Sequence, residues 1–493
     1  MKKLLITKNI NIIRSIIVLL ILFFVLPNFA MAKQKLFFKN GKFKICQFTD
    51  LHWKPGSPGC VVTSKTIQTV LEKEQPSLAI LTGDVVTYKP AIKGWKAVIE
   101  IFEEAGIPFT VTMGNHDAEI TTKDSIFNLL LASHYYVGSK GPKNIYGCGN
   151  CCIPVYGSQK GHEIKAVLYC IDSNDYLQVN TYGHYDWVHF NQIEWYRRQS
   201  ENYTKINNGI PIPSLAFFHI PLIEYNEILG NDDTYGNMLE DGVSSSKVNS
   251  GLFASFLDMK DVIGVFSGHD HNNDIIGIEK GIALAYGRVS GQDAYGSLQR
   301  GGRIIELYEG KKKFDTWIRT SLGKEDVYYY PSGLTSLDER KMNYLSAIKC
   351  TPKAHGVFYC YYEGICENTA QIKECKKIKE GILKNISIKG ALKEDHFAYE
   401  FRTLLKIPQR DIYQFYTFSD DGSVLYVDGK LVVNNDGGHS SREAVGKVAL
   451  DKGFHEMRVL YFEDYMGQEL KTGFWGRNIL KTYLPDSMLY LPE

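Results

Sequence analysis

Residues 262–271 read VIGVFSGHDH, an apolar run that stops at a glycine and then presents two histidines two positions apart. Such a run is typical of a buried strand. In extended backbone the side chains of residues i and i+2 point to the same side. His269 and His271 can therefore reach into one cleft while Asp270 faces elsewhere. This pair alone is weak evidence for a metal site, because a histidine is often only a packed polar group.

Short apolar segments alternate with segments of helical periodicity along the first 310 residues. In 91–105, for example, four apolar residues recur at helical spacing: Trp95, Val98, Ile99 and Phe102. This alternation predicts a layered α/β domain. Strands are expected at 43–49, 78–82, 108–113, 166–171, 215–218 and 262–266, with closing strands at 282–286 and 303–308.

Five of these predicted strands end in residues that bind metal ions. In open α/β sheets the carboxyl ends of the strands converge on the ligand crevice. Any single residue has an ordinary explanation: Asp84 could cap a helix and His219 could be a core histidine. The whole set indicates a site for hard-to-borderline divalent ions. It comprises three acids, one amide and five imidazoles: Asp50, His52, Asp84, Asn115, His116, Asp117, His219, His269 and His271.

Two metal ions about 3.5–4 Å apart need one bridging carboxylate, with the other ligands divided between them. Asp84 is the natural bridge, because the preceding Gly83 lets the backbone approach closely. The remaining ligands then form two groups, one for each ion: Asp50, His52 and one of the last two histidines, and Asn115, His219 and the other histidine.

His116 is left without a metal ion and stands next to Asp117. An imidazole beside the ions can contact a phosphate oxygen or protonate a leaving alcohol, and Asp117 could orient it. The ions would lower the pKa of a bridging water and neutralise phosphate charge. Hydrolysis of a phosphate ester is the chemistry that this set of residues favours.

The motifs Asp-x-His, Gly-Asp, Gly-Asn-His-Asp, a lone His and Gly-His-x-His, in this order, resemble the calcineurin-like metallophosphoesterase superfamily. They cover roughly residues 42–310. The resemblance implies an α/β fold, a β-sandwich of two sheets flanked by helices rather than one doubly wound sheet. It also implies that His271 belongs to the first ion and His269 to the second.

Residues 217–225, 240–245 and 247–251 are similar to the small plant purple acid phosphatases and their fungal relatives. Purple enzymes supply a tyrosine to ferric iron three residues after the Gly-Asp aspartate. Here Thr87 holds that position and Tyr88 comes one residue late, so His52 is expected to replace the tyrosine ligand. The identity of the two ions, among iron, zinc and manganese, stays open.

This similarity favours phosphomonoesters as substrates, attacked by a metal-bound hydroxide. Phosphodiesters are the alternative, since related Asp-x-His enzymes cleave them. A second alternative is a carbohydrate-binding surface protein with a vestigial phosphatase domain, against which the complete set of ligand positions argues. The net charge of +1 gives no support for nucleic acid or an anionic membrane as a partner.

The first 32 residues combine a basic start, an apolar run at 16–26 and a small-x-small site ending at Ala32. This pattern predicts a secretory signal, and the run is short for a membrane span. The mature protein is expected to be exported, periplasmic or at the cell surface, with no stable membrane span; a retained N-terminal anchor is the alternative.

Disulfides are expected in an exported protein. Four cysteines permit three pairings: Cys350, Cys360, Cys366 and Cys375.

After about residue 350, short alternating runs separated by turn residues predict an all-β module. Residues 415–437 and 453–463 resemble the β-sandwich first described in anthrax protective antigen. In yeast adhesins of this family two consecutive aspartates hold a calcium ion that contacts the sugar, and Asp420 and Asp421 stand at the corresponding point. Asp-Asp-Gly-Ser is also a good turn sequence by itself.

The expected division of the chain follows from these signals. It comprises a signal peptide at 1–32, a metallophosphoesterase domain at 33–312, a connecting segment at 313–349, a protective-antigen-type domain at 350–476 and a tail at 477–493.

Overall fold

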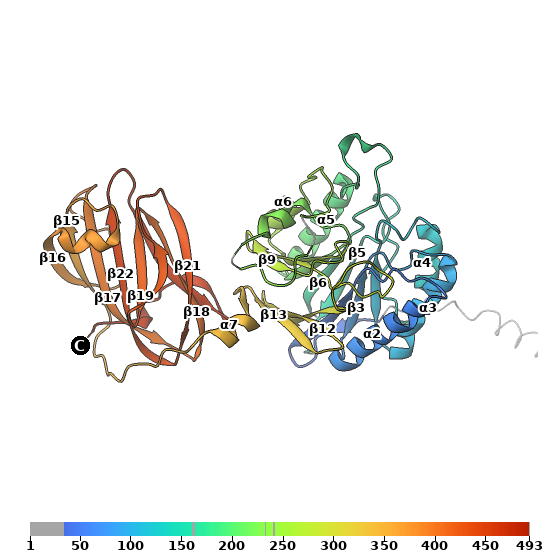
Figure 1. Cartoon of the computed structure of the whole chain (residues 1–493), viewed down its shortest axis with the longest axis horizontal. Helices are drawn as coiled ribbons and strands as arrows, with labels where there is room; N and C mark the ends of the chain where they lie inside the picture. The colour runs from blue at the N-terminus through green and yellow to red at the C-terminus, as the bar shows by residue number, and fades with distance from the viewer. Residues whose placement is uncertain (1–33, 160–162, 232, 240–241, 493) are drawn as a thin grey trace, which may run out of the picture.

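The computed structural model describes residues 34–492 except 160–162, 232 and 240–241. The predicted signal peptide lies outside the described residues. Two parts are visible in Figure 1, one with helices around strands and one built mainly of strands. Within the described ranges, no helix is both long and apolar enough to cross a membrane.

The first part contains two seven-stranded sheets. The first sheet has the order β1-β5-β6-β7-β8-β10-β9, with β6, β7, β8 and β10 parallel. Its strands are β1 (Leu36–Phe37), β5 (Cys151–Tyr156), β6 (Ile164–Cys170), β7 (Ser214–Phe217), β8 (Val262–Ser267), β9 (Ile276–Glu279) and β10 (Ile282–Tyr286).

The second sheet has the order β14-β13-β12-β11-β2-β3-β4, in which β2, β3 and β4 are parallel. Its strands are β2 (Lys42–Phe48), β3 (Leu78–Thr82), β4 (Phe109–Thr112), β11 (Gly301–Tyr308), β12 (Phe314–Thr320), β13 (Lys324–Tyr330) and β14 (Leu334–Thr335).

The two sheets pack face to face around one apolar core. Alternate residues of each strand point to this core: Phe43 and Ile45 from β2 meet Leu215 and Phe217 from β7, all fully buried. The opposite faces are also covered, because every residue of β3 is buried. Helices α2 (Pro58–Glu74), α3 (Ala91–Ala105) and α4 (Lys123–Ala132) cover the second sheet, and α5 (Phe190–Ile206) and α6 (Leu252–Met259) cover the first. The predicted helix-flanked β-sandwich is confirmed.

The first domain continues past its expected end at residue 312. Strands β12 and β13 extend the second sheet as an antiparallel pair, and β14 leads into α7 (Ser336–Lys341). The expectation of a connecting segment from residue 313 is therefore wrong for this stretch. The run Tyr328-Tyr329-Tyr330 is buried and completes β13, and the charged residues 324–326 that begin the strand gave no alternation from which to predict it.

The C-terminal part is the predicted all-β sandwich. One sheet has the order β16-β15-β17-β22-β19-β20, with β25 beside β17, and the other β21-β18-β23-β24. Their strands are β15 (Val357–Glu363), β16 (Lys376–Leu383), β17 (Phe397–Ile407), β18 (Asp411–Asp420), β19 (Ser423–Val427), β20 (Lys430–Asn435), β21 (Arg442–Leu450), β22 (Gly453–Glu463), β23 (Glu469–Gly476), β24 (Ile479–Tyr483) and β25 (Leu489–Tyr490).

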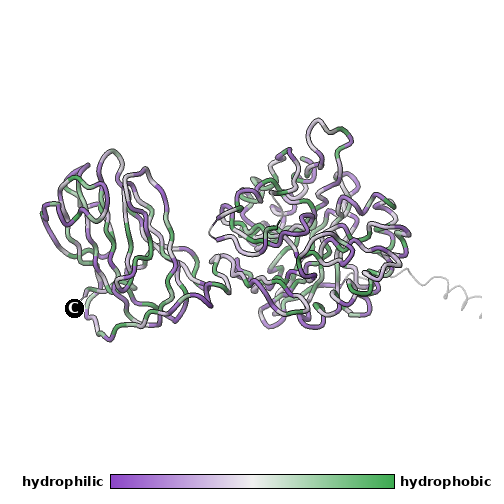
Figure 2. Tube along the Cα trace, viewed as in Figure 1, coloured by the Kyte–Doolittle hydropathy of each residue, from purple (hydrophilic) through white to green (hydrophobic). Residues whose placement is uncertain are grey.

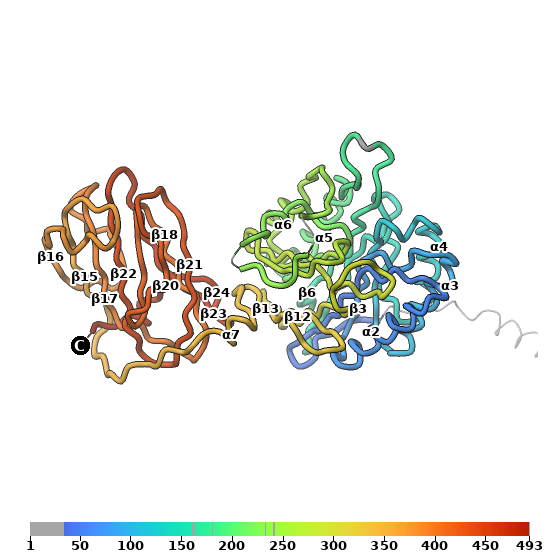
Figure 3. Tube along the Cα trace, viewed as in Figure 1, coloured from blue at the N-terminus to red at the C-terminus, as the bar shows by residue number. Residues whose placement is uncertain are grey.

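The described part of the expected tail, residues 477–492, is not separate, because β24 and β25 pair with β23 and β17. Apolar positions are distributed through both parts of the chain (Figure 2), and each part has its own buried core. The chain passes between them through β13 and α7 (Figure 3).

Candidate metal centre

The predicted ligands converge at the carboxyl ends of five strands. Asp50 and His52 follow β2, Asp84 follows β3, Asn115 and His116 follow β4, His219 follows β7, and His269 and His271 follow β8. Four of these residues have a left-handed backbone: Asp50 (φ 53°), His52 (φ 42°), Asp84 (φ 51°) and His269 (φ 80°). Each such conformation costs about 1–3 kcal/mol and is concentrated at functional sites.

The first group of donors is Asp50, His52 and His271, whose ligand atoms lie within 4.8 Å of one another. His271 Nε2 is 3.2 Å from Asp50 Oδ1. This is the grouping that the family resemblance implied for the first ion.

The second group is Asp84, His219 and His269, under the same 4.8 Å limit. Asp84 Oδ2 is 3.3 Å from His219 Nε2 in this group and 3.6 Å from His52 Nε2 in the first. One carboxylate oxygen thus reaches both groups, as a bridging ligand must.

Hydrogen bonds outside the centre set the orientation of three imidazole rings. Nδ1 of His219 lies 2.7 Å from the Thr82 carbonyl, Nδ1 of His271 lies 3.3 Å from the Tyr295 carbonyl, and Nδ1 of His52 lies 3.2 Å from Thr87 Oγ1. With Nδ1 engaged, Nε2 of each ring is turned toward the carboxylates. Metal-binding histidines are held in this way by partners around the site.

The donor set fits metal ions because its inward-facing atoms lack protein partners. Among the described residues, four buried atoms of the predicted ligands have no hydrogen-bond partner: Asp50 Oδ1, His52 Nε2, Asn115 Oδ1 and His269 Nε2. An unsatisfied buried polar atom costs about 1–3 kcal/mol. An ion held by Asp50, His52 and His271 would satisfy Asp50 Oδ1 and His52 Nε2 together.

The protonation states of the carboxylates and of two histidines also favour the binding of cations at the centre. Burial would raise the pKa of Asp50 and Asp84, but His271 beside Asp50 and His219 beside Asp84 hold both values well below the usual range. Burial lowers the pKa of His52 to about 4 and that of His269 to about 3, so both rings are in the neutral form that binds metals.

His219 differs from these two rings. Burial would lower its pKa, but Asp84 raises it to about 10. This imidazolium supplies the positive charge that the buried carboxylates require. Since a metal ligand must be deprotonated, binding of an ion here is coupled to release of that proton.

His116 lies at the open side of the centre, 36% exposed, with Nε2 4.0 Å from Asp84 Oδ2. Its Nδ1 is 2.8 Å from Glu119 Oε1, so Glu119 holds the ring.

The expectation that Asp117 orients His116 is wrong. Asp117 is buried and accepts hydrogen bonds from four backbone N–H groups, those of Gly114, Asp84, Val85 and Val86. It ties together the loops after β3 and β4, and burial with the nearby Asp84 charge raises its pKa to about 7.

Three tyrosines lie around the centre, and two of them, Tyr176 and Tyr185, were not considered from the sequence. Tyr295 stacks on His271 with ring centroids 3.8 Å apart, and Tyr185 contacts the His269 ring edge-on at 4.7 Å. The hydroxyl of Tyr176 is 2.6 Å from Asn115 Nδ2. Tyr176 and Tyr185 belong to the loop between β6 and α5, which carries no motif.

Tyr88 does not occupy the position of the tyrosine ligand of purple enzymes. Its side chain is 43% exposed, and Lys54 Nζ lies 4.8 Å from the centroid of its ring.

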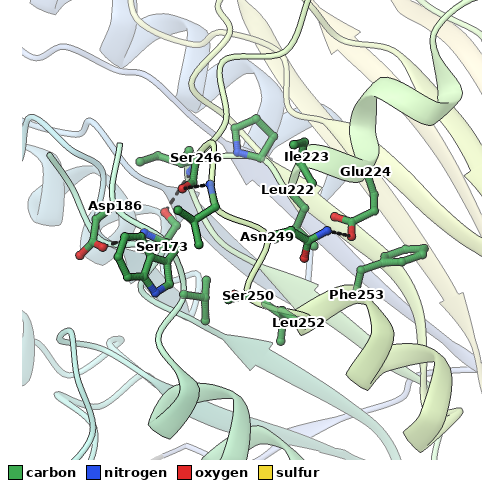
Figure 4. A pocket seen from close by; sticks show the side chains of 15 residues that line it. Ser173, Asp186, Leu222, Ile223, Glu224, Ser246, Asn249, Ser250, Leu252 and Phe253 are labelled. Atoms are coloured by element: carbon green, nitrogen blue, oxygen red, sulfur yellow. Dashed lines mark hydrogen bonds between the residues drawn. The ribbon is translucent and has the colours of Figure 1, made fainter. Parts of the chain in front are cut away.

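A small pocket lies next to the segment that follows His219 (Figure 4). Its lining includes Ile220, Pro221, Trp187 and Asn249, and its volume is about 30 Å³. A space of this size holds about one water molecule. This pocket is therefore too small for a phosphate ester.

A second cluster of acids lies in the C-terminal domain. One oxygen from each of Asp420, Asp421 and Glu463 lies within 4.8 Å of the others. Asp421 accepts hydrogen bonds from the backbone N–H groups of His439 and Asp464. Glu463 Oε1 is buried and has no partner among the described residues, and burial raises the pKa of this carboxyl to about 8.

Comparison with known proteins gives a family for each domain. A model described as calcineurin-like phosphoesterase matches residues 43–273, and one described as PA14 domain matches residues 353–485.

Two curated relatives illustrate the first match. The chain is 31% identical over 325 residues to "Probable inactive purple acid phosphatase 29" of Arabidopsis thaliana, covering 59% of this chain and 83% of the relative. It is 29% identical over 331 residues to "Phosphatase DCR2" of Saccharomyces cerevisiae, covering 60% of this chain and 56% of the relative.

Two solved structures are similar to parts of the chain. A dimetal phosphatase from Danio rerio matches 58% of this chain and 99% of its own, with 10% identity and a TM-score of 0.43. A PA14 sugar-binding domain from an RTX adhesin matches 28% of this chain and 100% of its own, with 19% identity and a TM-score of 0.25.

Proposed function

We propose that this chain, which belongs to the calcineurin-like phosphoesterase family and ends in a PA14 domain, hydrolyses phosphomonoesters at a two-metal centre outside the cytoplasm. The observation that carries the proposal is the pair of donor groups joined by Asp84. Buried atoms of Asp50, His52, Asn115 and His269 make no hydrogen bond among the described residues. A decayed site would have lost or re-paired such atoms, since leaving them unsatisfied is unfavourable. Here they persist on two groups joined by Asp84.

Two ions held by these residues would activate a water molecule and neutralise the charge of the phosphate. Asp50, His52 and His271 would hold one, Asn115, His219 and His269 the other, and Asp84 both. His116 lies at the solvent side, where its ring can donate a hydrogen bond to a phosphate oxygen or to the leaving oxygen. Glu119 supports the ring in that position through its contact with Nδ1.

The test is hydrolysis of an aryl phosphomonoester and of its diester counterpart by the chain from Lys33 onward. The apoprotein is loaded separately with zinc, manganese and iron, and the bound metal is counted. Monoester turnover that chelation abolishes supports the proposal. A strong preference for the diester favours the phosphodiesterase alternative. Full metal loading without turnover of either ester favours the vestigial alternative, in which the chain acts as a binding protein.

The N-terminal sequence supports export as part of this proposal. Expression of the full chain in a bacterial host, followed by cell fractionation and N-terminal sequencing, tests it. A mature protein that begins near Lys33 outside the cytoplasm agrees with the proposal. A full-length product that stays with the cells contradicts it.

The acid cluster of the C-terminal domain supports a second function, calcium-dependent binding of a carbohydrate. Glu463 Oε1 is a buried carboxylate oxygen without a partner, beside Asp420 and Asp421. Carboxylate oxygens are the ligands that calcium prefers. Calcium titration by calorimetry, followed by glycan-array binding with and without calcium, tests this function. The variant Glu463→Gln should lose calcium binding, whereas Glu456→Gln, on the same strand, should retain it.

A further inference from the structure

The loop between β6 and α5 brings Tyr176 to the open side of the metal centre. Tyr176 is half-buried and forms an isolated bridge to Tyr185. Its ring lies 4.9 Å from that of His184 and 5.9 Å from that of His116. These contacts hold the ring in place while leaving one side accessible to a ligand.

The hydrogen bond between Asn115 and Tyr176 sets the direction of the tyrosine hydroxyl. Asn115 Nδ2 donates to the Tyr176 oxygen over 2.6 Å, while Asn115 Oδ1 is buried and has no hydrogen-bond partner among the described residues. Because an amide nitrogen can only donate, the phenolic oxygen acts here as the acceptor. The phenolic hydrogen is therefore directed to another group.

The Tyr176 oxygen also lies 3.4 Å from both ring nitrogens of His116, so the two groups are neighbours. His116 is in turn held at Nδ1 by Glu119. The Tyr176 hydroxyl is a donor whatever the state of the His116 ring, and Nε2 of His116 is a second donor when that ring is protonated. Two donors at this separation can contact different oxygens of one phosphoryl group.

We propose that Tyr176 is a further catalytic residue, whose hydroxyl donates a hydrogen bond to a non-bridging oxygen of the phosphoryl group. This inference rests on the proposed function, because it requires a phosphate ester at the centre. Charge on the phosphoryl oxygens is stabilised best by donors already in position before the reaction. Tyr176 meets this condition because the amide of Asn115 and the surrounding rings hold it.

The test compares Tyr176→Phe with Tyr182→Phe, a change at a 62% exposed tyrosine of the same loop. Metal content, orthophosphate affinity by calorimetry and kcat are measured for each metal-loaded protein. Loss of one hydrogen bond to the phosphoryl group should weaken orthophosphate binding and lower kcat by about tenfold each in Tyr176→Phe. Tyr182→Phe should match the wild type, and both variants should retain their metal.

The measurements separate the failure of this inference from failure of the proposed function. If the wild type binds orthophosphate but turns over no ester, the proposed function fails while the affinity comparison still tests Tyr176. Unchanged affinity and kcat in Tyr176→Phe would overturn the inference. Loss of metal from Tyr176→Phe would also overturn it, because Tyr176 would then serve to position Asn115 and not to contact phosphate.

A second inference rests on a separate observation, the contact between Cys366 and Cys375. Their Sγ atoms are 3.1 Å apart, on either side of the short helix η3 (Thr369–Glu374). Cys366 is buried in a small apolar cluster with Ile372 and Phe462. The loop is anchored by Thr369, whose backbone N–H and hydroxyl donate to Asp436 over 2.8 and 2.9 Å.

We infer that Cys366 and Cys375 form a disulfide, which selects one of the three pairings open to the four cysteines of this region. The two thiols lose two protons and two electrons, the Sγ–Sγ bond forms, and a small-molecule disulfide is reduced to two thiols. The bond needs an approach of about 1 Å from the present contact. It would fix the loop between β15 and β16.

The test is equilibration of the full chain with oxidised glutathione, alkylation of the remaining thiols and peptide mapping by mass spectrometry. A cross-linked peptide pair that contains Cys366 and Cys375 is expected, and it should persist in Cys360→Ser. Reduction should lower the Tm of the C-terminal domain in the wild type but not in the double variant Cys366→Ser/Cys375→Ser. A different partner for Cys366, or alkylation of both thiols after equilibration, would overturn the inference.

Discussion

Asp84 is the residue on which the two halves of the centre depend, because its Oδ2 atom reaches His52 in one group and His219 in the other. Asp84→Asn replaces one carboxylate oxygen by an amide nitrogen, which cannot bind a cation. We expect at least one ion to be lost and turnover to fall by three orders of magnitude or more, on the order of what a metal centre contributes. Elemental analysis and steady-state kinetics measure both effects. Asp258→Asn, at an exposed site on α6, is the matched control; retained turnover in Asp84→Asn would refute the bridging role.

Asp117 acts on the centre through the backbone. Its carboxylate accepts four backbone N–H bonds from the loops after β3 and β4, which carry Asp84 and Asn115. Asp117→Asn places an amide N–H₂ against some of these donors, so we expect the free energy of unfolding to fall by about 1–3 kcal/mol and metal affinity to weaken. Chemical denaturation and metal titration measure the two effects. If Asp117 instead oriented His116, kcat would fall while stability and metal affinity stayed unchanged.

At the level of strands and helices, the arrangement of the metal ligands could be predicted because it depends on local rules. Parallel strands end at a common edge, so the ligand-bearing strand ends could be expected to come together. The choice of His271 rather than His269 as the partner of Asp50 and His52 came from the family resemblance and not from these rules. The buried side chain of Asp270 does point elsewhere, toward the hydroxyl of Tyr286. Such rules extend to any residue within two or three positions of a strand end.

Features of the site that depend on tertiary packing could not be predicted. The left-handed backbone of Asp50 and His269 gives no signal in the sequence, since it is imposed by the surrounding loops. Tyr176 and Glu119 lie in irregular segments whose paths are set by contacts far along the chain. The role of Asp117 was mispredicted for the same reason, because its partners include Val85 and Val86, more than thirty residues earlier.

Strand β7 connects the core between the sheets to the metal centre. Leu215 and Phe217 are fully buried between the sheets, and His219 follows two residues later. Leu215→Ala leaves a cavity in this core, and we expect a loss of about 2–5 kcal/mol in the free energy of unfolding. Denaturant unfolding of the metal-loaded protein measures this loss. Leu322→Ala, at an 80% exposed leucine, should change it by less than about 0.5 kcal/mol; equal losses would contradict the assigned core.

The titration of His455, on strand β22, should make the stability of the C-terminal domain depend on pH. His455 is buried, with Nδ1 2.6 Å from Asp428 Oδ2 and Nε2 2.9 Å from the Asp451 carbonyl. Burial alone would lower its pKa, but the bond to Asp428 raises it above the ordinary value. A raised pKa in the folded state stabilises the domain fully below the unfolded value of about 6.5. That stabilisation is lost as the pH rises through the folded value.

Calorimetric scans of the full chain between pH 6 and pH 9 should therefore show a falling Tm for the C-terminal domain. Asp428→Asn should lower the Tm at pH 6 and flatten its pH dependence, because the charge that raises the pKa of His455 is removed. The same slope in the variant and the wild type would assign the pH dependence to other groups.

At the scale of the whole molecule, the stretch expected to be a connector is a packed junction. The Ser332 carbonyl accepts from Trp475 Nε1 over 3.1 Å and from the side chain of Gln414. The guanidinium of Arg477 lies 3.5 Å from the centroid of the Tyr329 ring. Four buried apolar residues drawn from both domains pack here: Tyr329, Leu334, Ile412 and Ala449. Sequence patterns could not reveal this junction, because each of its residues fits an ordinary strand or loop.

Because the domains pack together at this junction, we expect the stability of each domain to affect that of the other. Ions bound only by the folded first domain stabilise it in proportion to their affinity and concentration. With the junction intact, chelation should lower the unfolding temperature of the first domain strongly and that of the second slightly. In the double variant Trp475→Ala/Arg477→Ala, chelation should affect the first domain alone. Differential scanning calorimetry of both proteins, with and without chelator, distinguishes these cases; a response of the second domain that the double variant leaves unchanged would show that the junction transmits no stability between the domains.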